Sequence, residues 1–329
     1  MDRQSSLLQW VQEQLNDDEC YVKPASNDAS FRSYWRVFSK ATTFIIMDAP
    51  PQHENCQPFI HVAKILADAG VHVPQVIAQD LDQGFLLLTD LGTVQYLNVL
   101  NPENYLELYT DAIKSLHHIQ QNTETDSLVS YNEAMLSQEL GLFEKWFINV
   151  HLDTTLSNQQ SKILQQTHTT LIENAQAQPQ IFVHRDFHSR NLMKTKDNNP
   201  GILDFQDAVI GAVTYDLVSL LKDCYLKLEE KFVTELSDNF RKSYNNLNNT
   251  NIPSQQWQRW FDLMGLQRHL KVVGIFCRLY YRDNKPNYLK DLNLTLCYIK
   301  TVCNQYAEFQ PLAQLIQELS PSMENICKS

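Results

Sequence analysis

Three oxygen-bearing side chains, those of Asp186, Asn191 and Asp204, have a spacing that could place them together. Two short apolar segments flank the turn-forming residues 196–201 (KDNNPG), and this pattern predicts a β-hairpin centred near residue 198. The hairpin would fold residue 191 back beside residue 204, and Asp186 lies five positions before Asn191, in the loop that leads into it. The sequence therefore predicts that the three side chains converge on one point.

This combination of groups suits phosphoryl transfer. The transferred group needs positioning and neutralisation of its charge more than covalent help. Mg²⁺ binds carboxylate and amide oxygens and keeps its remaining sites for phosphate and water, so Asn191 and Asp204 are its predicted ligands. Asp186 would orient the attacking hydroxyl group and accept its proton. The alternative is that all three are only polar residues of a hairpin loop.

The residues around this centre follow the order found in protein kinases. His184–Asn191 (HRDFHSRN) matches the catalytic-loop pattern H-R-D-x-x-x-x-N, and Asp204-Phe205 matches the D-F pair. The chain resembles the aminoglycoside phosphotransferase superfamily, the small-molecule relatives of protein kinases. His188 stands in place of the lysine usual in serine/threonine kinases, no Ala-Pro-Glu element follows, and only eleven residues separate Asp204 from Asp216.

This resemblance implies a protein-kinase-like fold, with ATP and Mg²⁺ as cofactors. It also implies supporting roles for two further residues, since His184 and Asp216 would hold the catalytic loop in place. A simpler interpretation of Asp216 is that it opens a helix, where a carboxylate is favoured by the helix dipole. The two roles are compatible.

Several longer stretches resemble, more narrowly, the bacterial kinases that phosphorylate the anomeric hydroxyl of N-acetylmuramate and N-acetylglucosamine in cell-wall (peptidoglycan) recycling. They are Met47–Pro51, Gly70–Gly92, Leu203–Asp223 and Arg268–Leu289. The similarity implies a small amino sugar as the substrate, which residue spacing alone does not identify. One alternative is a kinase of another small alcohol, such as an aminoglycoside or a choline-like compound. Another is a non-catalytic nucleotide-binding protein.

The order of the elements predicts an α+β fold with two lobes. Residues 1–92 would form a small nucleotide-binding N-lobe, with an antiparallel sheet, one helix and a hinge at its end. Residues 93–329 would form a larger, mainly helical C-lobe with the catalytic loop and the substrate pocket. The predicted N-lobe strands are 34–38, 43–47, 73–78 and 84–89. The predicted helices are 5–15, 58–69, 103–121, 132–149, 158–175, 215–246, 254–283, 286–308 and 311–319.

The nucleotide lobe departs from the kinase pattern. Kinases cover the phosphates with a glycine-rich loop, whereas residues 25–33 contain no glycine. Small residues there would still let backbone N–H groups approach a phosphate, although an ordinary polar turn is the alternative. Residues 86–90 would form the hinge, whose backbone binds adenine in the superfamily. The predicted nucleotide-binding residues are Ser26, Asn27, Asp28, Ala29, Ser30, Leu88, Thr89, Asp90 and Leu91.

The third-strand lysine that binds the ATP phosphates in kinases is missing. Met47 occupies its expected place. Arg32 or Arg36 could compensate for the lost cation, but a surface or strand role is an equal alternative for each. The missing lysine keeps the non-catalytic interpretation open.

The substrate pocket is expected in the helical lobe beside Asp186. N-acetylmuramate carries a carboxylate, for which an arginine fork is a natural partner. The long apolar segment 257–283 carries several cationic side chains, although arginine stems often only lie along an apolar surface. The predicted substrate contacts are Glu139, Arg268, His269 and Arg278.

Composition excludes some classes of protein. The chain has 27 Lys and Arg against 38 Asp and Glu, and a net charge of −11 repels nucleic acids and anionic membranes. Its seven cysteines are scattered and predict reduced thiols, not zinc ligands or disulfides. The polar first fifteen residues and the lack of a long apolar run predict a cytoplasmic protein without membrane insertion.

Overall fold

The computed structural model describes residues 2–27, 31–40 and 42–320. The chain divides into two compact units. The first contains Met1–Glu124 and Arg190–Ala208, and the second contains Thr125–Ser189 and Val209–Ser329. The catalytic-loop segment therefore passes from the second unit into the first after Ser189. The predicted boundary at residue 92 separates a nucleotide-binding lobe from a catalytic lobe. It is defined by function and not by compactness, and it stays a prediction.

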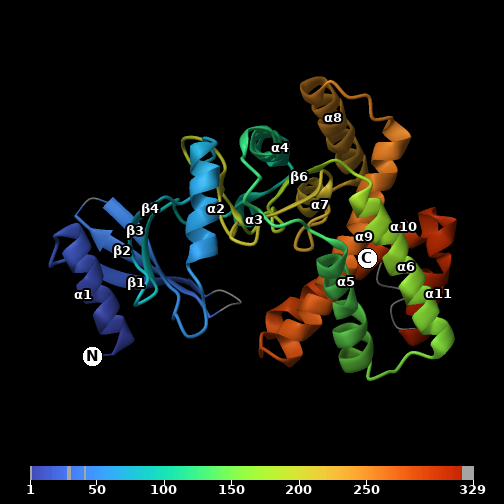
Figure 1. Cartoon of the computed structure of the whole chain (residues 1–329), viewed down its shortest axis with the longest axis horizontal. Helices are drawn as coiled ribbons and strands as arrows, with labels where there is room; N and C mark the ends of the chain where they lie inside the picture. Colours follow the sequence, from blue (N-terminus) through green and yellow to red (C-terminus); the bar gives the residue numbers. More distant parts are fainter. Residues whose placement is uncertain (1, 28–30, 41, 321–329) are drawn as a thin grey trace. The chain divides into compact units, whose positions relative to one another are not determined.

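The first unit is built on a five-stranded antiparallel sheet with the strand order β1-β2-β3-β5-β4 (Figure 1). Its strands are β1 (Tyr21–Asn27), β2 (Ser33–Ser39), β3 (Thr42–Asp48), β4 (Val76–Asp80) and β5 (Phe85–Thr89). The four predicted strands are confirmed as β2 to β5. Strand β1 was not predicted, because Pro24 breaks its strand pattern. Proline is tolerated in an edge strand, and the β1–β2 register shifts between Pro24 and Ser26.

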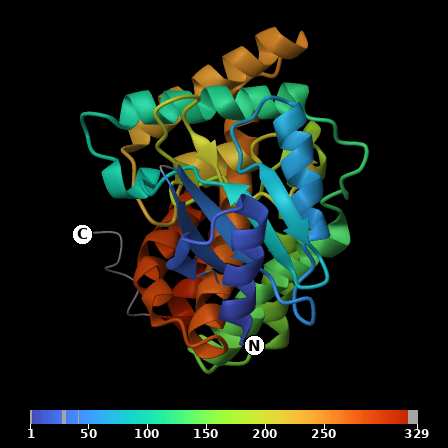
Figure 2. The same cartoon turned by 90° about the vertical axis from the view of Figure 1, so that its left-hand side faces the viewer.

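Helix α1 (Arg3–Leu15) packs on one face of this sheet (Figure 2). Its apolar residues recur at helical spacing, so one stripe of the helix is buried. The side chains that form this core are Leu7, Trp10, Val11, Cys20, Val37, Ile46, Phe85 and Leu87. Helix α2 (Gln57–Asp68) has Pro58 in its first turn, where proline is favoured, and lies on the other side of the sheet (Figure 1).

The remainder of the first unit consists of two helices and a short hairpin. The helices are α3 (Tyr96–Val99) and α4 (Tyr105–Asn122), and the strands are β7 (Leu192–Met193) and β8 (Gly201–Ile202). The hairpin predicted around residue 198 is confirmed, although its strands are shorter than expected.

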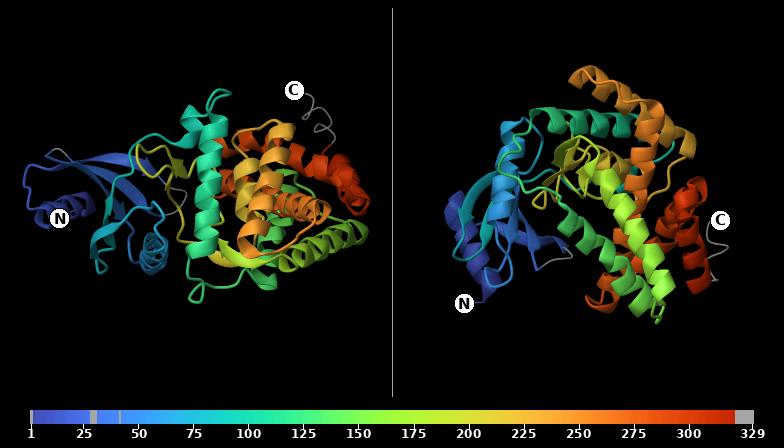
Figure 3. Two further views of the ribbon diagram at one scale, coloured as in Figure 1. Left: turned by 90° about the horizontal axis from the view of Figure 1, so that it is seen from above. Right: turned by 45° about the vertical axis from the view of Figure 1, so that its right-hand side comes forward.

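The second unit is mainly helical (Figures 1 and 3). Its α-helices are α5 (Glu133–Leu142), α6 (Asn158–Gln176), α7 (Tyr215–Leu221), α8 (Glu230–Asn248), α9 (Ser254–Tyr281), α10 (Leu292–Gln305) and α11 (Gln310–Leu319). A π-helix η1 (Phe143–His151) and two 3₁₀ helices, η2 (Pro286–Asp291) and η3 (Ala307–Phe309), complete the helices, and β6 (Gln180–Val183) pairs with β9 (Val209–Ala212). Helix α9, 28 residues long, contacts α5, η1, α6, α7, α8 and α10 and is the centre of this unit.

The prediction of one continuous helix over residues 215–246 is wrong. Helix α7 ends at Leu221 and α8 begins at Glu230. At the break, the Asp223 carboxylate accepts a hydrogen bond of 2.9 Å from the backbone N–H of Tyr225. A carboxylate that binds nearby backbone in this way competes with helical hydrogen bonding.

Within the described part of the chain, no helix is long and apolar enough to cross a membrane. Five cysteines there carry free, buried thiols, as predicted: Cys20, Cys56, Cys224, Cys277 and Cys303. Cys297 is disulfide-bonded, so the prediction of reduced thiols throughout is wrong at this position.

The close approach of α9 to the end of α5 gives a stability prediction. A Cβ atom added at Gly274 would lie 2.4 Å from the backbone carbon of Leu142, whereas one added at Gly141 would meet nothing within 4 Å. We expect Gly274→Ala to lower the free energy of unfolding by about 1–3 kcal/mol, because the two helices must separate. Gly141→Ala, the control, should be neutral or stabilise by up to about 1 kcal/mol. Urea denaturation of both variants tests this, and equal stabilities would contradict the packing described.

Candidate active site

The hairpin brings Asn191 and Asp204 together within the first unit. The backbone N–H of Leu203 donates to the Asn191 carbonyl at 2.9 Å, so the residues that flank the two strands face each other. The Asn191 amide nitrogen donates to Asp204 Oδ2 at 3.2 Å, and the Gln206 amide donates to Asp204 Oδ1 at 2.8 Å. The two predicted metal ligands are thus direct neighbours.

Side chains of the turn fix the hairpin to the rest of the first unit. The Asn199 amide nitrogen donates to the Tyr96 hydroxyl at 2.8 Å and to Asp111 at 3.0 Å. The Asn199 side-chain oxygen accepts from the Thr195 backbone at 3.2 Å, and the N–H of Ile202 donates to the His72 carbonyl at 2.8 Å. Asparagine is suited to this place because one side chain offers both donors and an acceptor.

In the second unit, Asp216 holds the start of the catalytic loop. Its carboxylate accepts hydrogen bonds from the backbone N–H groups of His184 at 2.6 Å and Arg185 at 3.0 Å. Arg185 has φ +77°, a left-handed conformation that costs energy for a residue with a side chain. The Asp216 side chain therefore compensates for a strained turn directly before Asp186.

The Asp216 carboxyl is 1% exposed, and its titration reflects this burial. Burial raises the pKa of Asp216 to about 7, although the hydrogen bonds from His184 and Arg185 act in the opposite direction. The charge of the nearby Asp186 adds to the rise.

A second carboxylate, which was not predicted from the sequence, holds the other end of the loop. Asp223 accepts the backbone N–H of Ser189 at 2.9 Å and the Ser189 hydroxyl at 2.5 Å. It stands seven residues after Asp216, just beyond the end of α7 at Leu221. Two acids at this spacing in an apolar segment were the feature of the sequence from which Asp223 could have been predicted.

Asp186 lies between these two attachment points. Burial acts to raise its pKa, but the positive charges of Lys271, His188, Arg268 and Arg185 outweigh it, so the pKa of Asp186 lies below its ordinary value. The backbone N–H of Asp186 donates to Nδ1 of His184 at 3.2 Å, and the His184 ring is fully buried. Asp186 is therefore an ionised carboxylate whose backbone is held locally.

Glu139, predicted as a substrate contact, belongs to a buried network of charges. It forms ion pairs with Arg185 and, at 3.0 Å, with Lys271, and it accepts the Tyr131 hydroxyl. Burial acts to raise the pKa of Glu139, but Lys271 and Arg185 hold it below its usual range. Lys271 also donates to the Tyr215 hydroxyl at 3.1 Å. Lys271 was not predicted from the sequence, because its pairing depends on tertiary structure.

The three predicted substrate residues of α9 have different environments. Arg268 is 3% exposed and donates to the Cys224 sulfur at 3.4 Å. Burial acts to lower the pKa of Arg268, but Cys224, Tyr215 and Asp186 outweigh it and raise that pKa. His269 stacks on Tyr298 at 4.7 Å, and burial lowers its pKa to about 3. Arg278 is half-buried near the end of α9, where burial and Arg282 lower its pKa.

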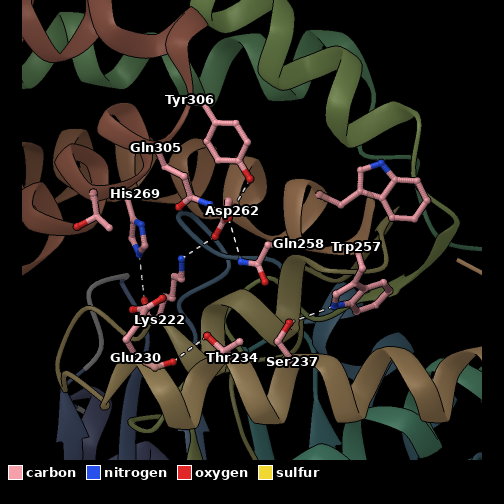
Figure 4. Close-up of polar contacts among 12 residues, drawn as sticks. Lys222, Glu230, Thr234, Ser237, Trp257, Gln258, Asp262, His269, Gln305 and Tyr306 are labelled. Carbon is pink, nitrogen blue, oxygen red and sulfur yellow. Dashed lines mark hydrogen bonds and ion pairs between the residues drawn. The ribbon is translucent and has the colours of Figure 1, made fainter. Parts of the chain in front are cut away.

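His269 has a structural contact that Figure 4 makes visible. Its Nε2 lies 3.0 Å from the carbonyl oxygen of Lys222, and the Lys222 ammonium pairs with Asp262 at 3.0 Å. Asp262 also accepts hydrogen bonds from Gln258, Gln305 and Tyr306 (Figure 4). This buried group fixes residue 222 and, through the chain, its neighbour Asp223.

The predicted nucleotide-binding residues lie in three settings. Ser26 and Asn27 belong to β1, Leu88 and Thr89 belong to β5, and Leu88 is buried in the core. Asp90 pairs with Arg36 at 2.6 Å and accepts the N–H of Gly92 at 2.9 Å, while Leu91 follows β5. Asp28, Ala29 and Ser30 lie outside the described residues.

Comparisons with known proteins define the class. The chain has the fold of kinase-like phosphotransferases: a choline kinase from Cryptosporidium parvum superposes with a TM-score of 0.64 at 14% identity, covering 94% of this chain and 99% of that one. An ADP-bound aminoglycoside phosphotransferase superposes with a TM-score of 0.59 at 13% identity, covering 89% and 97%. Residues 22–259 match the model of the phosphotransferase enzyme family.

Relatives of higher identity narrow this class. An N-acetylmuramate/N-acetylglucosamine kinase from Pseudomonas putida is 42% identical over 328 residues, 96% of each chain. Kinases of the same name from Pseudomonas aeruginosa and Neisseria meningitidis are 43% and 39% identical, and the matches cover 92% and 97% of this chain and 89% and 96% of those proteins. The chain belongs to the phosphotransferase enzyme family. The predicted family and two-lobed α+β fold class are confirmed.

Asp216 gives a prediction on pH. Because its pKa rises from an ordinary value near 3.8 to about 7 on folding, the folded state keeps a proton that the unfolded chain has lost at intermediate pH. Its contribution to stability is therefore complete below about pH 4 and is lost as the pH rises through 7. Asp216→Asn cannot ionise, so relative to this variant the wild type should lose on the order of 1–4 kcal/mol between pH 5 and pH 8.

Urea denaturation at several pH values measures the difference. Asp238→Asn is the control, because Asp238 lies on α8 in ion pairs with Arg241 and Lys242 and its pKa is lowered, not raised. Parallel pH profiles of the wild type and Asp216→Asn would contradict the assignment.

Proposed function

We propose that this protein is an ATP-dependent kinase that phosphorylates the anomeric hydroxyl of N-acetylmuramate, N-acetylglucosamine or both. The observation that carries the proposal is the 42% identity, over 96% of both chains, to a kinase named for these two sugars. The intact set of Asp186, Asn191 and Asp204 supports catalysis over a role as a non-catalytic nucleotide-binding protein. Since N-acetylmuramate is a peptidoglycan sugar, we place the protein in cytoplasmic recycling of that material.

Asn191 and Asp204 would hold Mg²⁺. They offer one amide and one carboxylate oxygen, the donors that this ion binds, and their side chains are already adjacent at 3.2 Å. No group of three His, Cys, Asp or Glu residues in the described ranges is arranged to hold a metal. Two protein ligands suit Mg²⁺, which fills its other sites with phosphate and water. When bound, the ion would neutralise charge on the phosphates.

Asp186 would orient the sugar hydroxyl and accept its proton. An ionised carboxylate is required for this, and the lowered pKa of Asp186 supplies one. Asp186 belongs to the second unit and Asn191 to the first, and the joint role of the two residues is proposed from the sequence pattern. In this proposal, His184, Asp216 and Asp223 position the loop without touching the reacting atoms.

For the nucleotide, we propose ATP bound between the β1–β2 connection and the hinge residues Leu88–Leu91. The named ligands of structurally similar proteins support a nucleotide: one aminoglycoside phosphotransferase is bound to ADP and another to GDP. Pairing of Asp90 with Arg36 and with the N–H of Gly92 gives the hinge a fixed conformation.

For the sugar, the buried cations of α9 and the catalytic loop are the proposed contacts. Arg268 and Lys271 both act on the charge of Asp186, so they belong to its surroundings. A cation there could bind the carboxylate of N-acetylmuramate or a ring hydroxyl group. Glu139 could accept a hydroxyl from the sugar while it keeps Arg185 and Lys271 in place. His269 is the least suited of the predicted contacts, because its ring stacks on Tyr298 and its Nε2 contacts the Lys222 carbonyl.

The reaction can be followed by ³¹P NMR of the purified protein with Mg-ATP and either sugar. We expect a sugar 1-phosphate signal together with ADP. Asp186→Asn should lower kcat by about 10²- to 10⁴-fold, because it removes the proton acceptor and keeps the shape. Asp238→Asn, which alters a carboxylate of α8 paired with Arg241 and Lys242, is the matched control.

Three outcomes decide between the alternatives. ATP binding without a product from either sugar would favour another small alcohol, and a screen of polyamines and sugars would then identify it. Absence of nucleotide binding by the wild type would contradict the kinase proposal. Full activity of Asp186→Asn would contradict the assignment of the base.

A further inference from the structure

The sheet of the first unit lacks the cation that kinases use to bind the ATP phosphates. Strand β3 has the sequence TTFIIMD, and Met47, at the expected place, is fully buried between Tyr34 of β2 and Leu86 of β5. A thioether in the core cannot replace an ammonium group. If the protein binds a nucleoside triphosphate, another basic residue of the first unit has to meet its charge.

The neighbouring arginines differ in how they are engaged. Arg36 makes two contacts with Asp90, at 2.6 and 3.1 Å, and donates to the Gly92 carbonyl at 2.8 Å, so it serves the hinge. Arg3, on α1, pairs with Asp48 at 2.8 Å and donates to the Gln83 carbonyl at 2.7 Å. Each of these two guanidinium groups thus ties separate segments of the chain together.

Arg32 stands at a more suitable position. It directly precedes β2, whose first residue Ser33 pairs with Asp48 at the end of β3. Arg32 therefore lies at the end of the sheet where the β1–β2 connection meets β2, two residues before Tyr34, the strand partner of Met47. In the kinase fold this end of the sheet faces the phosphates.

Glu54 fixes the guanidinium of Arg32. Arg32 Nε donates to Glu54 Oε2 at 3.2 Å, and the Glu54 Oε1 atom accepts the backbone N–H of Phe31 at 3.2 Å. The two side chains are only 13% and 14% exposed, so the pair is shielded from solvent. Burial acts to lower the pKa of Arg32, but Tyr34 and Glu54 outweigh it and raise that pKa. A guanidinium has five N–H donors in a fork, so one arginine can bind Glu54, Tyr34 and a phosphate together.

The start of α2 lies close in the chain to Glu54, and it packs against the segment that carries Asp204. Glu54 lies three residues before α2 begins at Gln57, and Phe59 in the first turn of α2 packs against Phe205 at a ring distance of 4.9 Å. Phe205 directly follows Asp204. In protein kinases, a lysine–glutamate pair of the sheet and the αC helix has to be in place together with the D-F segment. In this chain, Glu54 of the Arg32–Glu54 pair comes just before α2, and the Phe59–Phe205 contact is made by the first turn of α2.

We infer that Arg32, held by Glu54, is the phosphate-binding cation of this protein and replaces the missing third-strand lysine. Its ligand is the triphosphate of a nucleotide. The inference rests on the proposed kinase function and adds to it the residue that binds the phosphates.

Calorimetric titration of the full-length protein with Mg-ATP and with adenosine, which has no phosphate, tests the inference. Arg32→Ala should weaken ATP binding by about 10- to 100-fold, as expected for lost charge-assisted hydrogen bonds, and change adenosine binding less than about twofold. Arg32→Lys keeps the charge but not the fork, so its affinity for ATP should be intermediate. Arg259→Ala is the matched control, because Arg259 pairs with Glu308 at 2.8 Å on the surface of the second unit.

The outcomes separate this inference from the proposed function. Wild-type affinity for ATP in Arg32→Ala would overturn the inference and leave the kinase proposal intact. An equal loss of ATP and adenosine binding would also overturn it, because that loss would show a structural role. If Arg32→Ala fails to fold, as judged by thermal denaturation, Arg32→Lys decides the question. No ATP binding by the wild type would overturn the kinase proposal itself.

Discussion

The candidate site depends on one constraint, the hydrogen bonds that two buried carboxylates accept from the same loop. Asp216 binds the backbone of residues 184 and 185, and Asp223 binds the backbone and hydroxyl of Ser189. Asp186 lies between these points in the chain and is held through its neighbours. A buried carboxylate is costly unless it is fully hydrogen-bonded, so the loop and the acids stabilise each other. The positive φ of Arg185 is tolerated because Asp216 holds it.

The charges around this loop in turn depend on α9. Lys271 pairs with Glu139, which also pairs with Arg185 of the loop. Asp262 pairs with Lys222, the chain neighbour of Asp223. Breaking a buried ion pair leaves an uncompensated charge, which costs several kcal/mol, so these pairs specify one packing of α9 against its neighbours. Gly274 lets the same helix approach the end of α5 closely. The fold of the second unit and the position of its catalytic loop are therefore parts of one arrangement.

Features that depend on local sequence were predicted well. The hairpin that joins Asn191 to Asp204 follows from turn residues, and the strands β2 to β5 follow from short β-branched and aromatic segments. Strand β1 was missed because Pro24 contradicts strand propensity, and only pairing with β2 makes a strand there. The break between α7 and α8 was missed for a similar reason: Asp223 binds the Ser189 and Tyr225 backbones instead of continuing the helix.

Features that depend on tertiary partners were beyond the sequence. Lys271 and Glu139 meet from positions 132 residues apart, and their spacing in the chain carries no sign of this contact. His269 looked equivalent to Arg268 as a polar residue of an apolar helix, but its ring stacks on Tyr298 from α10. Only resemblance to known kinases suggested the sugar, because composition and spacing contain nothing specific to it.

Hydrogen exchange of the catalytic-loop amides tests the central claim most directly. In the wild type, the N–H groups of His184, Arg185 and Ser189 should exchange slowly, because buried carboxylates accept all three. Asp223→Ala should speed exchange at Ser189 by at least about tenfold, the loss expected for a buried charge-assisted hydrogen bond, while exchange within α6 stays unchanged. Wild-type protection of Ser189 in that variant would show that the loop is held by other means, and it would contradict the account.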